Sequence, residues 1–128
     1  MTILEDLMYK EYISIDKSGT LEDAIELMNQ NHQGVIVVID NNIPIGVLTE
    51  RNILEIIHKD IDQTKLILEI FTFQTPITVN KKRSIGYALH ILIDNGIRRL
   101  VVIDDFGVFK GVVTQDIRNP QVNPIPKL

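Results

Sequence analysis

The sequence contains one pattern twice. When the chain is shifted against itself so that Ile13 falls on Ile77, residues 13–40 match residues 77–104 in register. The identical pairs at this shift include Lys17 and Lys81, Ala24 and Ala88, and Asn31 and Asn95. The period is longer than the unit of a solenoid repeat, and there are only two copies. The repeat therefore predicts a chain built of two similar halves.

A second match at the same shift lies ahead of these segments. The tripeptide Ile-Leu-Glu occurs at residues 3–5 and again at residues 67–69. Each copy is therefore predicted to begin with a short helical segment. An extended segment follows it, at residues 13–15 in the first copy and 77–79 in the second.

The composition is that of an ordinary soluble globular domain, since 45% of the 128 residues are hydrophobic and 23% are charged. The net charge of −4 argues against nucleic acids and anionic membranes as partners, because both are polyanions. The longest apolar runs, such as residues 35–39, are far shorter than the roughly 20 residues that span a bilayer. The N-terminus carries acids instead of a basic leader, so we expect neither export nor membrane insertion.

The chain has no cysteine. Disulfides, thiolate zinc sites and cysteine nucleophiles are therefore excluded, and a reducing, cytoplasmic location is expected. The three histidines, His32, His58 and His90, do not have a metal-ligand spacing. The sequence also contains no Ser-His-Asp order and no glycine-rich phosphate loop, so we expect that the protein is not an enzyme.

The first copy predicts the order strand, helix, strand, strand, helix. Thr20 followed by Asp23 is typical of a helix cap, and the apolar residues that follow have helical spacing: Leu21, Ala24, Ile25 and Met28. Residues 35–39 form a β-branched run, as in a strand that is covered on both faces. A turn at 40–42 leads into a second strand at 44–48. Thr49 then opens a helix with apolar residues at Ile53, Leu54, Ile56 and Ile57.

The second copy repeats this order. Ser84 is expected to cap a helix that runs through Asp94 and stops at Gly96. Strands at Arg99–Ile103 and up to Val113 then flank a turn.

Two features distinguish the second copy from the first. Its first helix is apolar over more than one face, so we expect it to be covered from a second side. Its last helix has almost no length, because Pro120 ends it after Arg118. Further prolines keep the tail at 120–128 extended.

These motifs resemble the cystathionine β-synthase (CBS) domain pair, also called a Bateman module. The first copy carries them at residues 34–40, Gly-Val-Ile-Val-Val-Ile-Asp, and at 46–53, Gly-Val-Leu-Thr-Glu-Arg-Asn-Ile. The second copy carries them at residues 95–104 and at 111–114, Gly-Val-Val-Thr. The resemblance covers nearly the whole chain, from Thr2 to Asn119.

The resemblance implies a fold and a division of the chain. The fold class is α/β (α+β), a tandem pair of CBS β-α-β-β-α repeats packed with pseudo-twofold symmetry. The first repeat covers residues 1–61, the second covers 62–119, and 120–128 form a proline-bearing tail or linker. In the family the two sheets pack back to back and leave two clefts between the repeats.

The resemblance also implies a function. Members similar to this chain are non-catalytic regulatory modules that bind AMP, ADP, ATP, S-adenosylmethionine or a dinucleotide such as NAD in an inter-repeat cleft. Pairs usually form homodimers through the repeat helices, and they control an attached or associated effector. Neither a nucleic acid nor a membrane is expected as a partner.

The end of each hairpin is the candidate ligand site. Where a strand ends and a helix begins, backbone N–H groups and the helix dipole can hold an anion. In the family pattern, a threonine here is followed three residues later by an aspartate that binds both ribose hydroxyls. The first copy has Thr49 with Asn52 in the aspartate position, and an amide oxygen makes one such contact instead of two. The same pair has the spacing of a helix cap, so both interpretations stay open.

The second copy departs from the pattern differently, because Asp116 follows Thr114 by only two residues. Either Asp116 reaches the ligand through a distorted turn, or this corner has lost its ribose contact.

Arg98 and Arg99 stand where the family places a basic residue that faces ligand phosphates. Strand side chains alternate, so only one of them can face the ligand, where a guanidinium gives bidentate contacts. The alternative is that both are solvated strand ends that pair with Asp94 or Asp104. Residues 81–83, Lys-Lys-Arg, extend the phosphate site or form a solvated turn.

We therefore predict ligand-binding residues in both copies, with adenine against the apolar strand ends and polar groups around the ribose and phosphates. The first copy supplies Ser14, Ile15, Val35, Ile36, Thr49 and Asn52. The second supplies Thr78, Val79, Arg98, Arg99, Leu100, Val101, Thr114 and Asp116. The alternative hypothesis is a ligand-free dimerisation or protein-interaction module with degenerate clefts.

Overall fold

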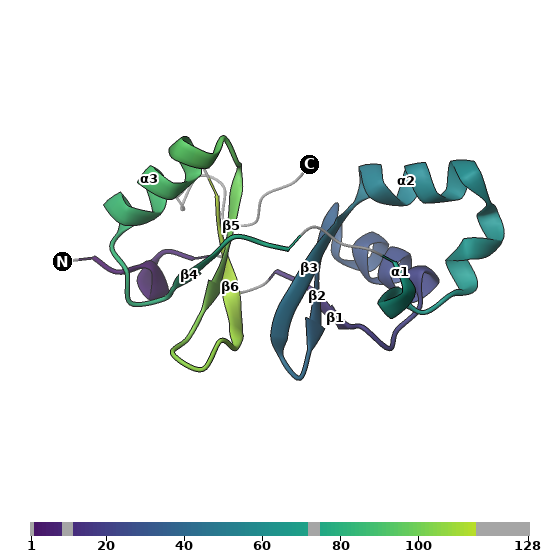
Figure 1. The fold of residues 1–128 in the computed structure, drawn as a ribbon, viewed down its shortest axis with the longest axis horizontal. Coiled ribbons are helices and arrows are strands. Elements are labelled where there is room, and N and C mark those ends of the chain that lie inside the picture. Colours follow the sequence, from purple (N-terminus) through teal and green to yellow (C-terminus); the bar gives the residue numbers. More distant parts are fainter. Residues whose placement is uncertain (1, 9–11, 72–74, 115–128) are drawn as a thin grey trace. The chain divides into compact units, whose positions relative to one another are not determined.

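The chain divides into two compact units, each with one three-stranded sheet (Figure 1). The structure, a computed structural model, describes residues 2–8, 12–71 and 75–114. Of these, residues 13–71 and 75 form the first-repeat unit, and residues 2–8, 12 and 76–114 form the second-repeat unit. The first residues of the first sequence copy therefore belong to the second-repeat unit, and the first residues of the second copy belong to the first-repeat unit.

The first-repeat unit places two helices on one side of its sheet (Figure 1). Its elements are β1 (Ser14–Asp16), α1 (Leu21–Asn31), β2 (Val35–Asp40), β3 (Ile43–Thr49), α2 (Glu50–Lys59) and the 3-10 helices η2 (Ile61–Lys65) and η3 (Leu68–Ile70). The central strand β2 is parallel to β1 and antiparallel to β3. The predicted order is confirmed, while η2 is a short element that the sequence pattern did not indicate.

The second-repeat unit has the same sheet topology. Its elements are η1 (Leu4–Asp6), β4 (Thr78–Asn80), α3 (Ile85–Asn95), β5 (Arg99–Ile103) and β6 (Phe109–Thr114). The central strand β5 is parallel to β4 and antiparallel to β6. The expected last helix of this copy and the tail at 120–128 lie outside the described residues.

Local signals place the helix ends where the sequence predicts them. The Thr20 hydroxyl accepts a hydrogen bond from the Asp23 N–H, and the Asp23 carboxylate accepts one from the Thr20 N–H, both over 3.0 Å. The Ser84 hydroxyl caps α3 by accepting a hydrogen bond from the Tyr87 N–H over 3.2 Å. α3 ends at Gly96 with a left-handed φ of 60°, and α1 ends at the equivalent position, His32, with a φ of 53°.

The two hairpins differ in length by one residue. In the first hairpin Ile39 pairs with Pro44, whereas its counterpart Ile103 pairs with Phe109. The longer loop is held by Asp104, whose Oδ1 accepts hydrogen bonds from two backbone N–H groups, those of Phe106 and Val108, over 2.9 and 3.0 Å. Thr114 is consequently the structural counterpart of Thr49, although it lies one position beyond the sequence shift of the repeat.

Alternation along the strands distributes their side chains over two faces. On the helix face, the first core contains Ile36, Val38 and Leu48, and the second contains Leu100, Val102 and Val113. The opposite face, here called the outer face, carries Val35 and Val37 in one unit and Val101 and Val112 in the other, all of them buried. The central strands are thus buried on both faces, as their β-branched runs predict.

Each core is completed by a leucine from the beginning of the other sequence copy. Leu4 packs with Val79, Ala88 and other residues of the second-repeat core, and Leu68 packs in the first-repeat core. Both leucines are 0% exposed. Within the part of the chain that the structure describes, no helix combines the length and apolar character needed to cross a membrane.

Candidate ligand-binding corners

Each unit ends its hairpin with a threonine directly opposite the start of the central strand. Thr49 pairs with Val35, and Thr114 pairs with Arg99. Directly opposite residues of antiparallel strands share a face of the sheet, here the outer face. We call Val35, Thr49 and Asn52 the first-repeat corner, and Arg99 with Thr114 the second-repeat corner.

The structure divides the predicted ligand-binding residues between the two faces of the sheets. On the outer faces lie Ser14, Val35, Thr49, Thr78, Arg99, Val101 and Thr114. On the helix faces, within the cores, lie Ile15, Ile36, Val79 and Leu100. Ile36 and Leu100 are 0% exposed, so their side chains are not open to a ligand. Arg98 and Asn52 are exposed beside the sheets, and Asp116 lies outside the described residues.

Thr49 and Asn52 form a reciprocal helix cap at the start of α2. The Thr49 hydroxyl accepts from the Asn52 N–H over 3.2 Å, and Asn52 Oδ1 accepts from the Thr49 N–H over 3.1 Å. The N–H of Glu50, the first residue of α2, donates to the Gly34 carbonyl over 3.0 Å. Two N–H groups of the first turn therefore already have protein acceptors, which weakens this helix end as an anion site. The capping interpretation of the pair is confirmed.

Arg98, just before β5, and Arg99, its first residue, make no ion pair within the described residues. The acids that were expected as alternative partners are engaged elsewhere, since Asp94 lies 2.9 Å from His90 Nε2 and Asp104 lies 3.7 Å from Lys110 Nζ. Arg99 is half-buried and shares the outer face with Val101, while Arg98 is exposed ahead of the strand. Of the two, Arg99 is the guanidinium that belongs to the corner.

The basic loop at residues 81–83 is occupied by contacts within its own unit. Lys81 Nζ lies 2.7 Å from Glu5 Oε2, and Lys82 Nζ lies 2.6 Å from Asp105 Oδ2. The Arg83 guanidinium lies 4.4 Å from the centre of the Tyr87 ring. A phosphate at this loop would have to compete with these partners.

These contacts shift the titration of the charged groups. The hydrogen bond to Glu5 raises the pKa of Lys81, and in the first-repeat unit the hydrogen bond to Glu69, followed by the one to Asp40, raises the pKa of Lys17. Lys82, and after it Asn80, holds the pKa of Asp105 below its usual value. The ammonium groups of Lys17 and Lys81 therefore stay charged at neutral pH, where each neutralises acids of its own unit.

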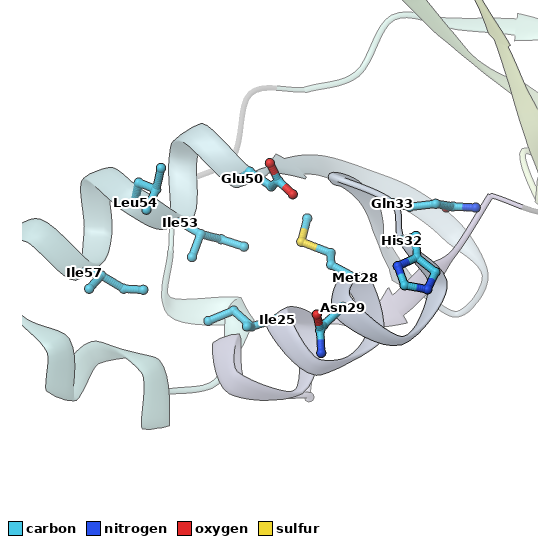
Figure 2. A pocket seen from close by; sticks show the side chains of 9 residues that line it. All are labelled: Ile25, Met28, Asn29, His32, Gln33, Glu50, Ile53, Leu54 and Ile57. Atoms are coloured by element: carbon cyan, nitrogen blue, oxygen red, sulfur yellow. The ribbon is translucent and has the colours of Figure 1, made fainter. Parts of the chain in front are cut away.

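A groove that the sequence did not indicate lies between α1 and α2 of the first-repeat unit (Figure 2). It encloses about 510 Å³. Its lining is apolar at Ile25, Met28, Ile53, Leu54 and Ile57, and polar at Asn29, His32, Gln33 and Glu50. Ile25 and Met28 from α1 face Ile53 from α2 across this space (Figure 2). The apolar spacing of both helices is the sequence signal, but spacing alone does not show how far apart two helices stand.

Comparison with known proteins finds the same family model in two segments of the chain. The CBS domain family model matches residues 4–59 and 69–116. The uncharacterised protein MK0525 of Methanopyrus kandleri is 32% identical over 106 residues, which make up 81% of this chain and 53% of that protein. Inosine-5'-monophosphate dehydrogenase of Chlorobaculum tepidum is 33% identical over 88% of this chain but only 23% of the enzyme. The chain spans about half the length, or less, of the first curated relatives that it matches.

Solved structures with the same fold include complexes with adenosine compounds. CBSX2 in complex with AMP superposes with a TM-score of 0.76 at 20% identity, over 97% of this chain and 98% of that one. PAE2072 from Pyrobaculum aerophilum, complexed with AMP, gives 0.75 at 22% identity, over 91% and 89%. The CBS pair of MJ0100, with 5'-methylthioadenosine and S-adenosyl-L-methionine, gives 0.74 at 18% identity, over 97% and 98%. At these identities the likeness shows the fold.

The family model covers more than half of the chain, in two segments. The structure adds two sheets of identical topology and a mixed α+β fold. The chain belongs to the CBS domain family.

Proposed function

We propose that this chain is a non-catalytic regulatory CBS pair that binds an adenosine-containing ligand at its corners. Arg99 carries the proposal, because it lies opposite Thr114 on the outer face and makes no ion pair among the described residues. A half-buried guanidinium without an acidic partner is a strong binding group for phosphate. The adenosine ligands named for CBSX2, PAE2072 and MJ0100 support this ligand class.

In this proposal the two corners have different roles. The second-repeat corner holds the phosphates with Arg99, while Thr114 adds a hydroxyl beside it. The first-repeat corner offers a capped helix end, where Asn52 makes at most one ribose contact after breaking its bond to Thr49. The adenine ring lies against the outer face of a sheet near Val35 or Val101, which are each 3% exposed. Ligands that carry at least one phosphate, namely AMP, ADP, ATP and NAD, are therefore preferred over S-adenosylmethionine, which carries none.

Binding transmits a signal to an effector by shifting a population of conformations. A ligand that binds one arrangement of the chain more tightly than another changes their ratio by that difference in affinity. The longer curated relatives support the presence of an effector segment or partner, because this region makes up only part of each. We place the regulated module in the cytoplasm, where adenine nucleotides are abundant.

The test is a thermal-shift panel with AMP, ADP, ATP, S-adenosylmethionine and NAD on nucleotide-free protein. A ligand at about 100 times its dissociation constant stabilises the fold by roughly 2.7 kcal/mol, a rise in Tm of roughly 10 °C for a chain of this size. Arg99→Ala should reduce the shift given by a phosphate-bearing ligand, whereas Lys59→Ala, which removes an exposed positive charge on α2, should not. The absence of any shift at millimolar ligand would exclude the proposal.

A second candidate function is a ligand-free dimerisation or protein-interaction module, and the Thr49–Asn52 cap favours it. The helices support a homodimer in either case, since Leu54 on α2 is 67% exposed and Ile93 on α3 is 76% exposed. We propose that the groove between α1 and α2 is filled by a second copy of the chain. Leu54→Glu should then shift the sedimentation coefficient from that of a dimer to that of a monomer, with the ligand-induced shift retained.

A further inference from the structure

The two units contain equivalent sockets that hold the same tripeptide. Ile-Leu-Glu at residues 3–5 lies in the second-repeat unit, and Ile-Leu-Glu at residues 67–69 lies in the first-repeat unit. We call residues 2–8 the N-terminal arm and its place in the second-repeat unit the arm socket. Residues 3–5 belong to the first sequence copy but lie in the second-repeat unit. Residues 67–69 belong to the second sequence copy but lie in the first-repeat unit.

In the arm socket, the side chain of Leu4 is buried and the backbone around it is hydrogen-bonded. Ile3 forms an antiparallel bridge with Ser84. The Leu4 N–H donates to the Arg83 carbonyl over 2.9 Å, and the Glu5 N–H donates to the Lys81 carbonyl over 3.0 Å. The Leu4 side chain is 0% exposed in the second-repeat core.

The first-repeat unit binds its tripeptide with the same set of contacts. Ile67 forms an antiparallel bridge with Thr20. The Leu68 N–H donates to the Gly19 carbonyl over 2.8 Å, and the Glu69 N–H donates to the Lys17 carbonyl over 3.0 Å. Leu68 is also 0% exposed, in the first-repeat core.

The charge contact is equivalent as well. Glu5 Oε2 lies 2.7 Å from Lys81 Nζ, and Glu69 Oε1 lies 3.2 Å from Lys17 Nζ. Lys17 and Lys81 are identical residues at the repeat shift. Each socket therefore recognises three features of a peptide, namely a bridging backbone, a buried leucine and a glutamate that pairs with a lysine.

From this duplication we infer that the arm socket is a binding site for Ile-Leu-Glu segments, and that the N-terminal arm of a second copy of the chain occupies it by exchange. The occupant is specified by the structure, because the arm already fills the socket with a complementary leucine and glutamate. The arm is held by one fully buried leucine, by the partly buried Leu7 and Met8, and by a few polar contacts, so it can be released in a local opening without unfolding of the whole unit. Exchange of an identical element between copies then preserves every contact.

The absence of cysteine allows a direct test with the full chain. Ile3→Cys and Ser84→Cys place two thiols at bridge partners, and bridged strands have the Cα separations of about 4.5–5.5 Å that a disulfide requires. The variant with both substitutions should form an intrachain disulfide in dilute solution, which also shows that the loss of the Ser84 cap is tolerated. If it does not oxidise, the arm does not occupy the socket and the inference is wrong.

The exchange is measured by mixing the two single variants under oxidation. We expect a disulfide-linked pair of one I3C chain and one S84C chain, with a yield that rises with protein concentration. The control mixture is Asp62→Cys with Phe106→Cys, both at exposed positions outside the sockets, which reports random collision. A yield no higher than in this control would overturn exchange between copies.

Competition by a free peptide of residues 2–8 tests the recognition itself. The peptide should suppress the I3C–S84C product, and the same peptide with alanine in place of Leu4 should require a concentration roughly 30-fold higher or more. Equal competition by the two peptides would show that the socket does not recognise the leucine side chain.

Discussion

The backbone N–H of Thr49 donates to Asn52 Oδ1, and the backbone N–H of Asn52 donates back to the Thr49 hydroxyl. In the family pattern, the position of Asn52 carries the aspartate that binds the ribose. In this chain the Thr49 hydroxyl and Asn52 Oδ1 accept hydrogen bonds within the first turn of α2. The free energy that a ribose contact adds to binding is therefore reduced by that of the cap hydrogen bond it replaces. Arg99 at the other corner, which has no ion pair among residues 2–8, 12–71 and 75–114, is therefore the better indicator of binding.

Asn52→Asp should increase the affinity of the first-repeat corner for adenosine ligands without loss of stability. A carboxylate keeps one oxygen on the Thr49 N–H, leaves a second for ribose, and interacts favourably with the N-terminus of α2. We expect the free energy of unfolding to be unchanged or higher by about 0.3–1 kcal/mol. Isothermal titration calorimetry with AMP and urea denaturation measure the two effects. Asn52→Ala is the control, and it should lose about 0.5–1.5 kcal/mol of stability with no gain in affinity.

Leu4→Ala should destabilise the second-repeat unit, although Leu4 belongs to the first sequence copy. Removing most of a fully buried leucine costs about 2–5 kcal/mol. Hydrogen exchange should show lost protection in residues 78–114 and little change in residues 14–59. The control variant Ile61→Ala, at a residue that is 67% exposed, should stay within about 0.5 kcal/mol of the parent. Lost protection mainly in residues 14–59 would contradict the assignment of Leu4 to the second-repeat core.

Gly96→Ala and His32→Gly should change stability in opposite directions. Both positions end a helix in the left-handed region, with φ of 60° and 53°. An added Cβ at Gly96 meets no atom within 4 Å, so the penalty of about 1–2 kcal/mol comes from the backbone conformation alone. His32→Gly relieves the same strain and should stabilise by about 0.5–1 kcal/mol. Chemical denaturation of the two variants decides the matter, and a destabilised H32G protein would show that His32 makes compensating contacts.

Asp105→Asn should make the free energy of unfolding depend less on pH in acid solution. Lys82 and Asn80 hold the pKa of Asp105 below 3.8, so its contribution is complete above that pH and is lost as the pH falls through the lower folded pKa. Unfolding free energies between about pH 2 and pH 5 should therefore fall less steeply in the variant. Lys82→Gln removes the main cause of the shift and should reproduce most of this change. A slope equal to that of the parent in both variants would exclude a role for this pair.

Much of the fold could be predicted because its signals are local. Thr20 with Asp23 and Gly96 mark helix ends through contacts within one turn, and the structure confirms both. The β-branched runs at 35–39 and 99–103 identify the central strands by the same reasoning. The candidate site stays a prediction. Its residues include strand neighbours such as Val35 and Ile36, whose side chains lie on opposite faces of the sheet, and a linear pattern does not show which face is open to a ligand.

The sequence by itself determined that two similar α+β halves exist, because the duplication and the hydrophobic spacing are properties of the linear order of residues. Only the tertiary structure decided which Ile-Leu-Glu segment completes which core, since both sockets offer the same hydrogen bonds and the same lysine. It also decided that Arg99, and not Arg98, shares a face with Thr114, because the register of β5 and β6 depends on the length of the hairpin loop. Burial and pairing between distant segments are collective properties, and no local pattern of residues encodes them.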